Sequence, residues 1–141
     1  MINGEYAIYI VGIGGTGVVT LAHILGYAAL FDGKKVSEMN RTGLAQKGGP
    51  VESPVILGDE TIPISSHIET GQCDLYLATD IVGAVNPTNL QVASIQRTVA
   101  IVSSSEVPTS KMVYDPQYLD RNLKGMKQSI NQYSRSEENL Y

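Results

Sequence analysis

Short apolar runs alternate with stretches of helical periodicity along this chain. The first run, residues 6–11, is rich in β-branched and aromatic residues and shows little alternation, which predicts a strand buried on both faces of a sheet. A glycine-rich turn follows, and from Val18 to Phe31 the apolar residues recur at helical spacing, so a helix is expected there. Gly33 provides a stop signal for that helix.

The rest of the chain predicts a further set of short elements. Strands are expected at residues 34–38, 51–57, 74–80 and 98–103, and helices at residues 81–94 and 118–132. Pro50 and Pro54 predict that the strand at 51–57 lies at a sheet edge or contains a bulge, because proline cannot donate a ladder hydrogen bond. The helix at 81–94 is entered near Asn86 and Pro87, a cap residue followed by a residue favoured in the first helical turn. Residues 40–49 have no clear period and predict a loop.

Strands and helices that alternate in this order favour an α/β layer fold. We predict a three-layer Rossmann-like fold around a mostly parallel sheet. The chain has 141 residues, which is the size of one domain that can bury a substantial core. Residues 1–141 are therefore expected to form a single domain, although the pattern does not give the order of its strands.

The charge and cysteine content argue against several classes of function. Ten Lys and Arg against 14 Asp and Glu leave a net charge of −4, which disfavours nucleic-acid binding through clustered cations. Cys73 is the single cysteine, so this chain alone cannot form an internal disulfide or hold a Cys-rich zinc site or an iron–sulfur cluster. The two histidines make no convincing metal site, and no apolar run reaches the ~18–20 residues that span a bilayer. These features predict a cytoplasmic protein without metal, membrane or nucleic-acid sites.

Four isolated residues of chemical interest also have simpler structural interpretations. We expect His23, in the first helix, to be a partly buried histidine with satisfied hydrogen bonds, and Cys73 to be a small buried hydrophobe. His67 is expected at the surface or in an interface. Asp80 stands at the carboxyl end of a predicted strand and has two open interpretations: a ligand contact at the sheet edge, or the cap of the following segment.

The turn after the first strand has the glycine spacing of a dinucleotide-binding loop. Glycines there permit a tight turn and a close backbone approach, and the following helix offers free N–H groups to a phosphate. Glu38 lies about twenty residues further on, where an acid that binds ribose is expected. Alternatively, the turn serves packing alone, or faces an anion that is not a dinucleotide. The candidate ligand-binding residues of this turn are Gly12, Gly14, Gly15, Thr16 and Gly17.

The loop after the predicted strand at 34–38 is too specific for a generic linker. It reads Arg41-Thr42-Gly43-Leu44-Ala45-Gln46-Lys47-Gly48-Gly49-Pro50-Val51. Together with the glycine turn, this loop resembles the gamma domain of 2-oxoacid:ferredoxin oxidoreductases, and in particular that of indolepyruvate ferredoxin oxidoreductase and its fused relatives. The resemblance continues in collinear order through residues 71–80 and 86–90 to a segment that ends at Pro108 and Thr109, so it covers nearly the whole chain.

This resemblance implies one part of an enzyme complex. Members of that family decarboxylate a 2-oxo acid on thiamine diphosphate, pass electrons through iron–sulfur clusters to ferredoxin and release an acyl-CoA. The resemblance implies that the thiamine diphosphate and the clusters belong to partner domains or subunits, that coenzyme A binds in the complex, and that the assembly is oligomeric. This chain then supplies no catalytic residue of its own and is expected to be inactive in isolation. Because relatives continue for another strand and helix, the chain is expected to be cut at its C-terminal end.

The second loop carries the candidate contacts to substrate, coenzyme A or a partner domain. Lys47 is a candidate contact for the substrate carboxylate or a phosphate of coenzyme A, and Arg41 is a second cation suited to a bidentate contact. The loop's threonine and glutamine are candidates for hydrogen bonds to a polar group, and its last two glycines permit close backbone approach. Both cations could instead form interdomain salt bridges or face solvent. The candidate residues are Arg41, Thr42, Gln46, Lys47, Gly48 and Gly49.

Two other functions remain open from the sequence. One is a free-standing dinucleotide-binding domain of a dehydrogenase, which the glycine spacing supports but which leaves the loop around Lys47 unexplained. The other is a structural or assembly module in which both glycine loops serve close packing between subunits. Charged residues make up only 17% of the chain, which indicates a partly covered surface and fits a complex or an assembly module better.

Overall fold

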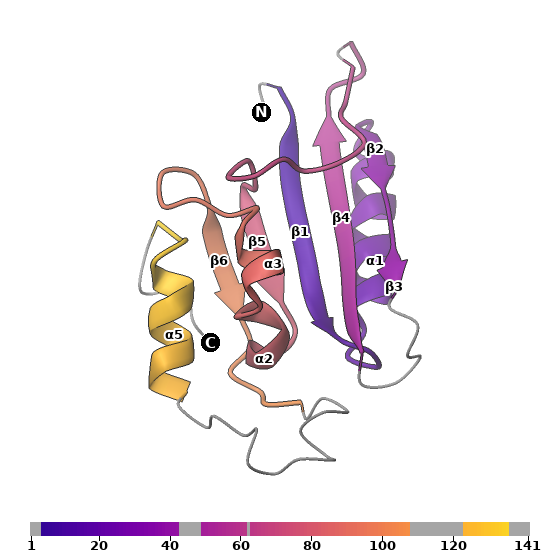
Figure 1. The fold of residues 1–141 in the computed structure, drawn as a ribbon. Helices are drawn as coiled ribbons and strands as arrows, with labels where there is room; N and C mark the ends of the chain where they lie inside the picture. The colour runs from indigo at the N-terminus through magenta and orange to yellow at the C-terminus, as the bar shows by residue number, and fades with distance from the viewer. Residues whose placement is uncertain (1–3, 43–48, 62, 108–122, 136–141) are drawn as a thin grey trace.

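A six-stranded sheet forms the centre of the structure, a computed structural model that describes residues 4–42, 49–61, 63–107 and 123–135 (Figure 1). Its strands are β1 (Tyr6–Ile13), β2 (Lys35–Glu38), β3 (Arg41–Thr42), β4 (Pro50–Gly58), β5 (Leu75–Ala78) and β6 (Val99–Val102). The helices of the described residues are α1 (Val18–Phe31), α2 (Ile81–Ala84), α3 (Pro87–Leu90) and α5 (Leu123–Asn131). The strand order is β2-β4-β1-β5-β6, and β3 also pairs with β4.

One strand, β4, runs against all the others. β1 pairs in parallel with β5, and β5 with β6, whereas β4 pairs antiparallel with β1, β2 and β3. Five of the six strands in the described part of the chain therefore share one direction, which confirms the mostly parallel sheet. The reversed strand separates β1 from β2, and this order could not be read from the pattern.

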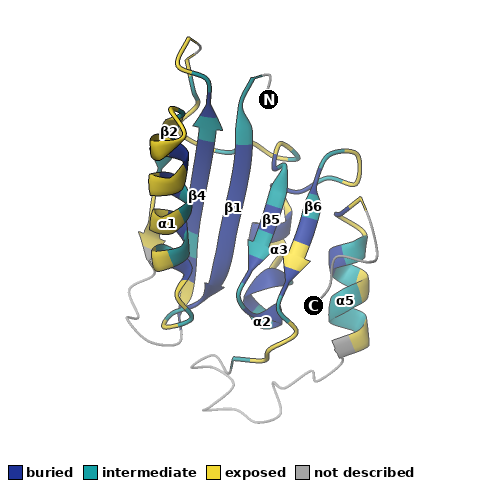
Figure 2. Ribbon diagram, turned by 180° about the vertical axis from the view of Figure 1, so that it is seen from behind, coloured by how far each residue is buried: buried dark blue, intermediate teal, exposed yellow. Residues whose placement is uncertain are grey.

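Helices cover both faces of this sheet, which confirms the three-layer α/β architecture (Figures 1 and 2). α1 packs on one face, against β4, β2 and β1, while α2, α3 and α5 lie on the other face. The alternation of β1 side chains divides the core between the two layers, since Ile8 and Ile10 pack under α1 whereas Tyr9 and Val11 belong to the opposite cluster. β1 is thus buried on both faces, as its apolar run predicted.

Most predicted elements are present, but the expected helix at 81–94 is broken. Two short helices, α2 and α3, flank Asn86, whose backbone is extended with φ −61° and ψ 123°. A residue that precedes proline is driven out of the helical region, so Pro87 ends one helix and starts the next. Asn86 caps α3 as expected, because its side chain accepts a hydrogen bond from the Thr88 N–H at 3.1 Å. α5 confirms most of the helix predicted at 118–132, of which 118–122 lie outside the described residues.

The prediction that prolines place β4 at an edge or on a bulge was wrong. β4 lies inside the sheet, and its pairing with β1 is continuous from Tyr6 opposite Leu57 to Ile13 opposite Pro50. Pro54 is tolerated because its carbonyl accepts from the Met39 N–H, between β2 and β3. The N–H and C=O of one strand residue point to the same side, so the missing donor of this proline falls at the break between those two short strands.

Residues 40–49 were predicted as loop, and this was wrong at the start of the segment. Arg41 and Thr42 form β3, opposite Glu52 and Val51 of β4. A strand of two residues has no period of its own, so only its pairing partner reveals it. Residues 43–48 lie outside the described part of the chain.

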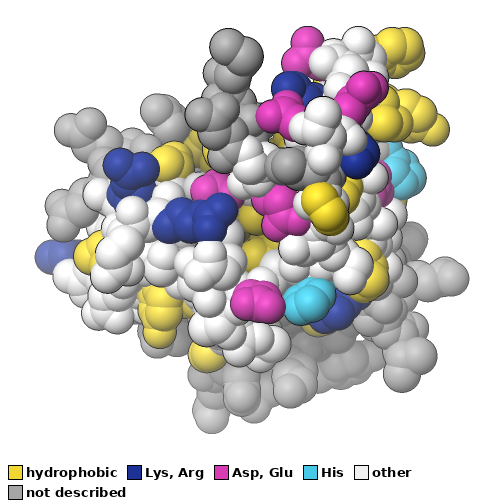
Figure 3. Space-filling model, turned by 90° about the horizontal axis from the view of Figure 1, so that it is seen from above, with side chains coloured by type: hydrophobic (Ala, Val, Ile, Leu, Met, Phe, Trp, Pro, Cys, Tyr) yellow, Lys and Arg dark blue, Asp and Glu magenta, His cyan; other side chains and the backbone are white. Residues whose placement is uncertain are grey.

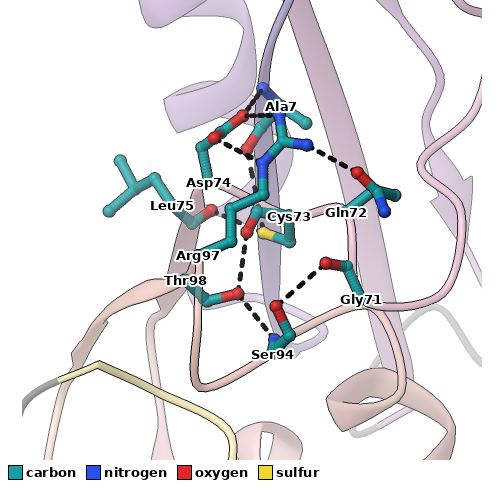
Figure 4. Close-up of polar contacts among 9 residues, drawn as sticks. All are labelled: Ala7, Gly71, Gln72, Cys73, Asp74, Leu75, Ser94, Arg97 and Thr98. Atoms are coloured by element: carbon teal, nitrogen blue, oxygen red, sulfur yellow. Dashed lines mark hydrogen bonds and ion pairs between the residues drawn. The ribbon is translucent and has the colours of Figure 1, made fainter.

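At the opposite end of the parallel strands, Asp74 and Arg97 tie β1, β5 and β6 together (Figure 4). The Asp74 carboxylate accepts two hydrogen bonds from the Arg97 guanidinium, at 2.6 and 2.8 Å, and one from the Ala7 N–H at 2.8 Å. Arg97 also donates to the side chain of Gln72 at 2.6 Å. This cluster fixes the register at the start of β5, away from the edge that carries the glycine turn.

No helix in the described ranges is long and apolar enough to cross a membrane.

Candidate functional site

The glycine turn and the last residues of the second loop, Gly49 to Val51, lie together at the edge of the sheet where β1 ends and β4 begins (Figure 1). The N–H of Gly14 donates a hydrogen bond to the carbonyl oxygen of Gly49 at 2.8 Å. Gly49 is buried, and the strand pairing continues directly from Ile13 opposite Pro50. Two motifs from separate parts of the sequence therefore form one edge, next to the carboxyl ends of the parallel strands β5 and β6.

Because Gly12 has no side chain, the hydroxyl groups of two threonines can lie against its backbone at the end of β1. The Oγ1 atoms of Thr16 and Thr79 are 2.6 Å apart, and Thr16 Oγ1 also donates to the Ile13 carbonyl at 2.7 Å. A Cβ atom at Gly12 would lie 2.0 Å from Thr79 Oγ1, so this position accepts hydrogen alone. Gly12 and Thr16 thus have a packing role, and the donor proton of Thr16 is used inside the turn.

Gly15 and Gly17 are the exposed part of the turn. Both have positive φ angles, +98° and +85°, and a Cβ at either position would meet open space. Gly17 is the N-cap of α1, and no side chain in the described residues caps that helix end. The N–H groups of the first helical turn are therefore available to an anion, which is what the functional interpretation of this turn requires.

Asp80, whose role the sequence left open, acts as a cap and a tether. Its side chain is fully buried, with Oδ1 accepting from the Gly83 N–H and Oδ2 from the Ile13 N–H, both at 2.7 Å. Burial raises the pKa of the Asp80 carboxyl, and the backbone hydrogen bonds oppose that effect. The carboxylate thus holds the start of α2 against the end of β1, and both oxygens are engaged within the protein.

Arg41 faces a different hollow from the glycine turn. It lies opposite Glu52 on β4, which in turn lies opposite Val11, and it lines a hollow of about 250 Å³ beside α3 together with Tyr9 and His67. Burial and hydrogen bonding to Glu52 raise the pKa of the Tyr9 phenol. Arg41 therefore stands one layer away from the exposed end of α1, on the other face of the sheet.

The remaining residues of the second loop are only partly placed. Thr42 lies opposite Val51, level with Gly12 of β1. Gln46, Lys47 and Gly48 lie outside the described residues, so their roles stay predictions.

Glu38 does not stand where an acid that binds ribose would be needed. It lies opposite Val55, which lies opposite Ile8, so Glu38 is level with the middle of β1 and separated from it by β4. Its carboxylate instead contacts His23 Nε2 at 3.1 Å and accepts from the Asn40 amide at 2.9 Å. The expectation that His23 is partly buried was wrong, since 52% of its side chain is exposed, but the ring does have partners. The strand order thus weighs against a dinucleotide site.

Cys73 has the structural role that its sequence context predicts. The residue is fully buried, and its thiol donates to the Leu75 carbonyl at an S···O distance of 3.1 Å. Burial raises the pKa of this thiol to about 12, so it does not fit a cluster ligand, which must be a thiolate.

Within the described residues no group of three His, Cys, Asp or Glu side chains could hold a metal ion. His67 is exposed, as expected.

Sequence reasoning missed two residues that shape the edge. Thr79 was treated only as strand, although its hydroxyl completes the turn beneath Gly12. Gly83 was not singled out, although a Cβ there would lie 3.1 Å from the Gly12 Cα. The only signal was closeness to Asp80 in the sequence: Thr79 directly precedes it, and Gly83 follows it by three positions.

Comparison with known proteins decides the family. Residues 7–132 match the family model described as pyruvate ferredoxin/flavodoxin oxidoreductase. The chain belongs to this family. Membership confirms the resemblance carried by the glycine turn and the second loop.

Relatives within the family share the fold and a part of their length. Indolepyruvate oxidoreductase subunit IorB of Pyrococcus horikoshii is 36% identical over 85 residues, which cover 60% of this chain and 41% of that protein. IorB of Methanothermobacter thermautotrophicus is 31% identical over 112 residues, covering 79% of this chain and 54% of that protein. The crystal structure of pyruvate oxidoreductase subunit PORC from Thermotoga maritima has a TM-score of 0.55 at 22% identity and covers 79% of this chain and 55% of that one. The chain therefore spans about half the length of these relatives.

Proposed function

We propose that this chain is the gamma-type part of a 2-oxoacid:ferredoxin oxidoreductase with a role like that of IorB. In this proposal the complete enzyme is cytoplasmic, decarboxylates a 2-oxo acid such as indolepyruvate, forms an acyl-CoA and reduces ferredoxin. Thiamine diphosphate and the iron–sulfur clusters are held by partner domains or subunits, since the single cysteine of this chain is buried. Family membership over residues 7–132 supports the proposal.

The edge formed by the glycine turn and the second loop is the part that we assign to ligand binding. The observation that carries this assignment is the hydrogen bond from Gly14 to Gly49, because it anchors the end of the second loop beside the start of α1. The exposed N–H groups of a helix start attract anions, and ligands of open α/β sheets bind at the carboxyl ends of the strands. Lys47 precedes Gly49 by two positions and would add a cation. The proposed ligand is an anionic part of coenzyme A or of the 2-oxo acid.

The first test is the composition of the complex. A tagged chain is isolated from its source cells under anaerobic conditions, and the eluate is assayed for iron and thiamine diphosphate. Both at fixed ratios to the chain would support a place in the oxidoreductase. If a tagged protein that includes any longer reading frame is also isolated without iron and thiamine diphosphate, the proposal fails. Titration with dinucleotides would then test the alternative of a free-standing dinucleotide-binding domain.

The second test addresses the ligand role in the assembled enzyme. Lys47→Ala is expected to raise the apparent KM for coenzyme A or for the 2-oxo acid, because it removes the cation that we assign to the anionic ligand. Lys124→Ala is the matched control, since Lys124 is an exposed lysine on α5. Unchanged values for both substrates in the Lys47 variant would refute the ligand role while leaving family membership intact.

A further inference from the structure

The outer face of α1 is apolar although it is exposed. The helix contains no Asp, Glu, Lys or Arg, and its sequence is apolar around most of its circumference. Four large side chains on this face are exposed: Ile24 by 60%, Tyr27 by 64%, Leu30 by 54% and Phe31 by 91%. A helix that is apolar all round is typical of one that is covered on every side. Figure 2 shows this uncovered face as the exposed outer surface of α1.

A groove lies beside this face. It has a volume of about 440 Å³ and runs between α1 and β2, which stands at one end of the strand order. Its lining residues are His23, Gly26, Tyr27, Leu30, Val36, Glu38 and Asn40. In the view of Figure 3, apolar side chains gather at the side of the molecule that carries α1 and β2. The same side of the protein therefore offers a protruding aromatic ring, Phe31, and a groove whose walls are apolar at Tyr27, Leu30 and Val36 and polar at His23, Glu38 and Asn40.

We propose that this face binds a second copy of the same chain, with the two α1 helices antiparallel about a twofold axis near Tyr27. This surface is defined by Ile24, Tyr27, Leu30 and Phe31 together with the groove. Antiparallel helices that cross at position 27 place position i opposite position 54 − i. Ile24 then faces Leu30 of the partner subunit, and Phe31 faces the position of the partner's His23, at the rim of the groove. A surface that carries both the protruding group and its receptor closes as a symmetric dimer.

Charge and area both fit this occupant. Because α1 carries no acidic or basic residue other than its histidine, the two helices can approach without like-charge repulsion. The one carboxylate of the groove, Glu38, already contacts His23 at 3.1 Å and Asn40 at 2.9 Å within its own copy. The spacing of Ile24, Tyr27 and Phe31 is three and then four residues, which is the seam of antiparallel helix packing. Side chains of this size and exposure present on the order of 500 Å². A twofold contact would bury about 1,000 Å² in total, near the lower limit for a specific interface.

The test is the association state of the full chain in sedimentation velocity. The wild-type chain is expected to dimerise reversibly, and Ile24→Glu and Phe31→Glu are each expected to weaken the dimer by about 100-fold or more, because a charge would be buried without a partner. Both side chains are exposed, so the variants should keep the circular dichroism spectrum of the wild type. Ile95→Glu is the matched control: Ile95 is 55% exposed, outside α1, and its variant should dimerise normally.

A cross-linking experiment tests the position of the axis. In Tyr27→Cys the new thiols lie next to the proposed axis and should form an intermolecular disulfide, whereas Ile95→Cys should not. The natural Cys73 is buried and does not compete. A monomeric wild type, a dimer that survives both glutamate variants, or equal dissociation by Ile95→Glu would each overturn the proposal. Protection of α1 from hydrogen exchange only in the presence of a different subunit would assign the face to that subunit instead. None of these outcomes depends on the proposed function.

Discussion

The Asp80 carboxylate and the backbone N–H of Ile13 form a buried hydrogen bond of 2.7 Å that ties the end of β1 to the start of α2. The same carboxylate also accepts from Gly83, so one side chain sets the spacing between the glycine turn and the neighbouring helix. The sheet edge that we assign to ligand binding thus depends on a residue that is not available to any ligand.

Replacement of Asp80 should lower stability strongly. Asp80→Ala leaves two buried N–H groups without acceptors, and each such loss costs ~1–3 kcal/mol, so the free energy of unfolding should fall by about 2–6 kcal/mol. Asp80→Asn keeps one acceptor and places an amide donor against the other N–H, so it should fall between the alanine variant and the wild type. Urea denaturation measures both. A loss below about 0.5 kcal/mol for Asp80→Ala would show that the tether is dispensable.

The glycines of the turn should respond unequally to alanine. At Gly12 the added methyl group would lie 2.0 Å from Thr79 Oγ1 and 2.8 Å from Thr16 Oγ1, so Gly12→Ala must displace the threonine pair and should cost about 2–4 kcal/mol. At Gly15 the methyl group meets open space, and only the φ of +98° is unfavourable, so Gly15→Ala should cost ~1–2 kcal/mol. Thermal denaturation of the two variants provides the comparison. Equal losses would mean that backbone strain, and not the close contact, determines the need for glycine.

Asp74 should matter more than its partner Arg97 (Figure 4). Arg97→Ala removes a bidentate pair whose arginine side chain is 36% exposed, so solvent screening limits the loss to about 1 kcal/mol or less. Asp74→Ala also leaves the Ala7 N–H without its acceptor and should cost an additional ~1 kcal/mol or more. A double-mutant cycle in urea denaturation separates the pair from the backbone contact. If Arg97→Ala proved the more damaging, the backbone contact would not be the main role of Asp74.

Alkaline pH should destabilise the protein through Cys73. Burial raises the pKa of its thiol to about 12, whereas an unfolded thiol titrates near ~8.5. The folded state keeps a proton that the unfolded chain releases, so this contribution to stability is complete below the unfolded pKa and is lost as pH rises toward 12. Unfolding free energy should therefore fall from about pH 8.5 upward, and Cys73→Ala should flatten the curve between about pH 8.5 and 9.5.

The range from about pH 8.5 to 9.5 ends where buried tyrosines begin to contribute to the pH dependence of stability. Burial also raises the pKa values of Tyr9 and Tyr76, so their contribution has the same sign but begins near the unfolded tyrosine value of ~10. Urea denaturation at fixed pH values, with the wild type and Cys73→Ala side by side, measures the difference. Parallel curves below pH ~9.5 would exclude Cys73 as the source.

The sequence alone determined the local elements and the family. The first strand and α1 follow from short-range patterns, because an apolar run without alternation and a helical period each reflect how nearby side chains are buried. Asn86 was identified as a cap for the same reason, since its hydrogen bond spans two residues. The glycine turn and the second loop carried the family resemblance, which needs only the order of residues along the chain.

Only the tertiary structure decided how these elements pair. The insertion of β4 between β1 and β2 depends on hydrogen bonds between residues far apart in sequence, and no local pattern encodes them. That insertion moved Glu38 away from the turn, made Pro54 tolerable inside the sheet and placed Arg41 on the face opposite α1. The bonds from Gly14 to Gly49 and from Ile13 to Asp80 are equally non-local, so their roles became visible only once the strands were side by side.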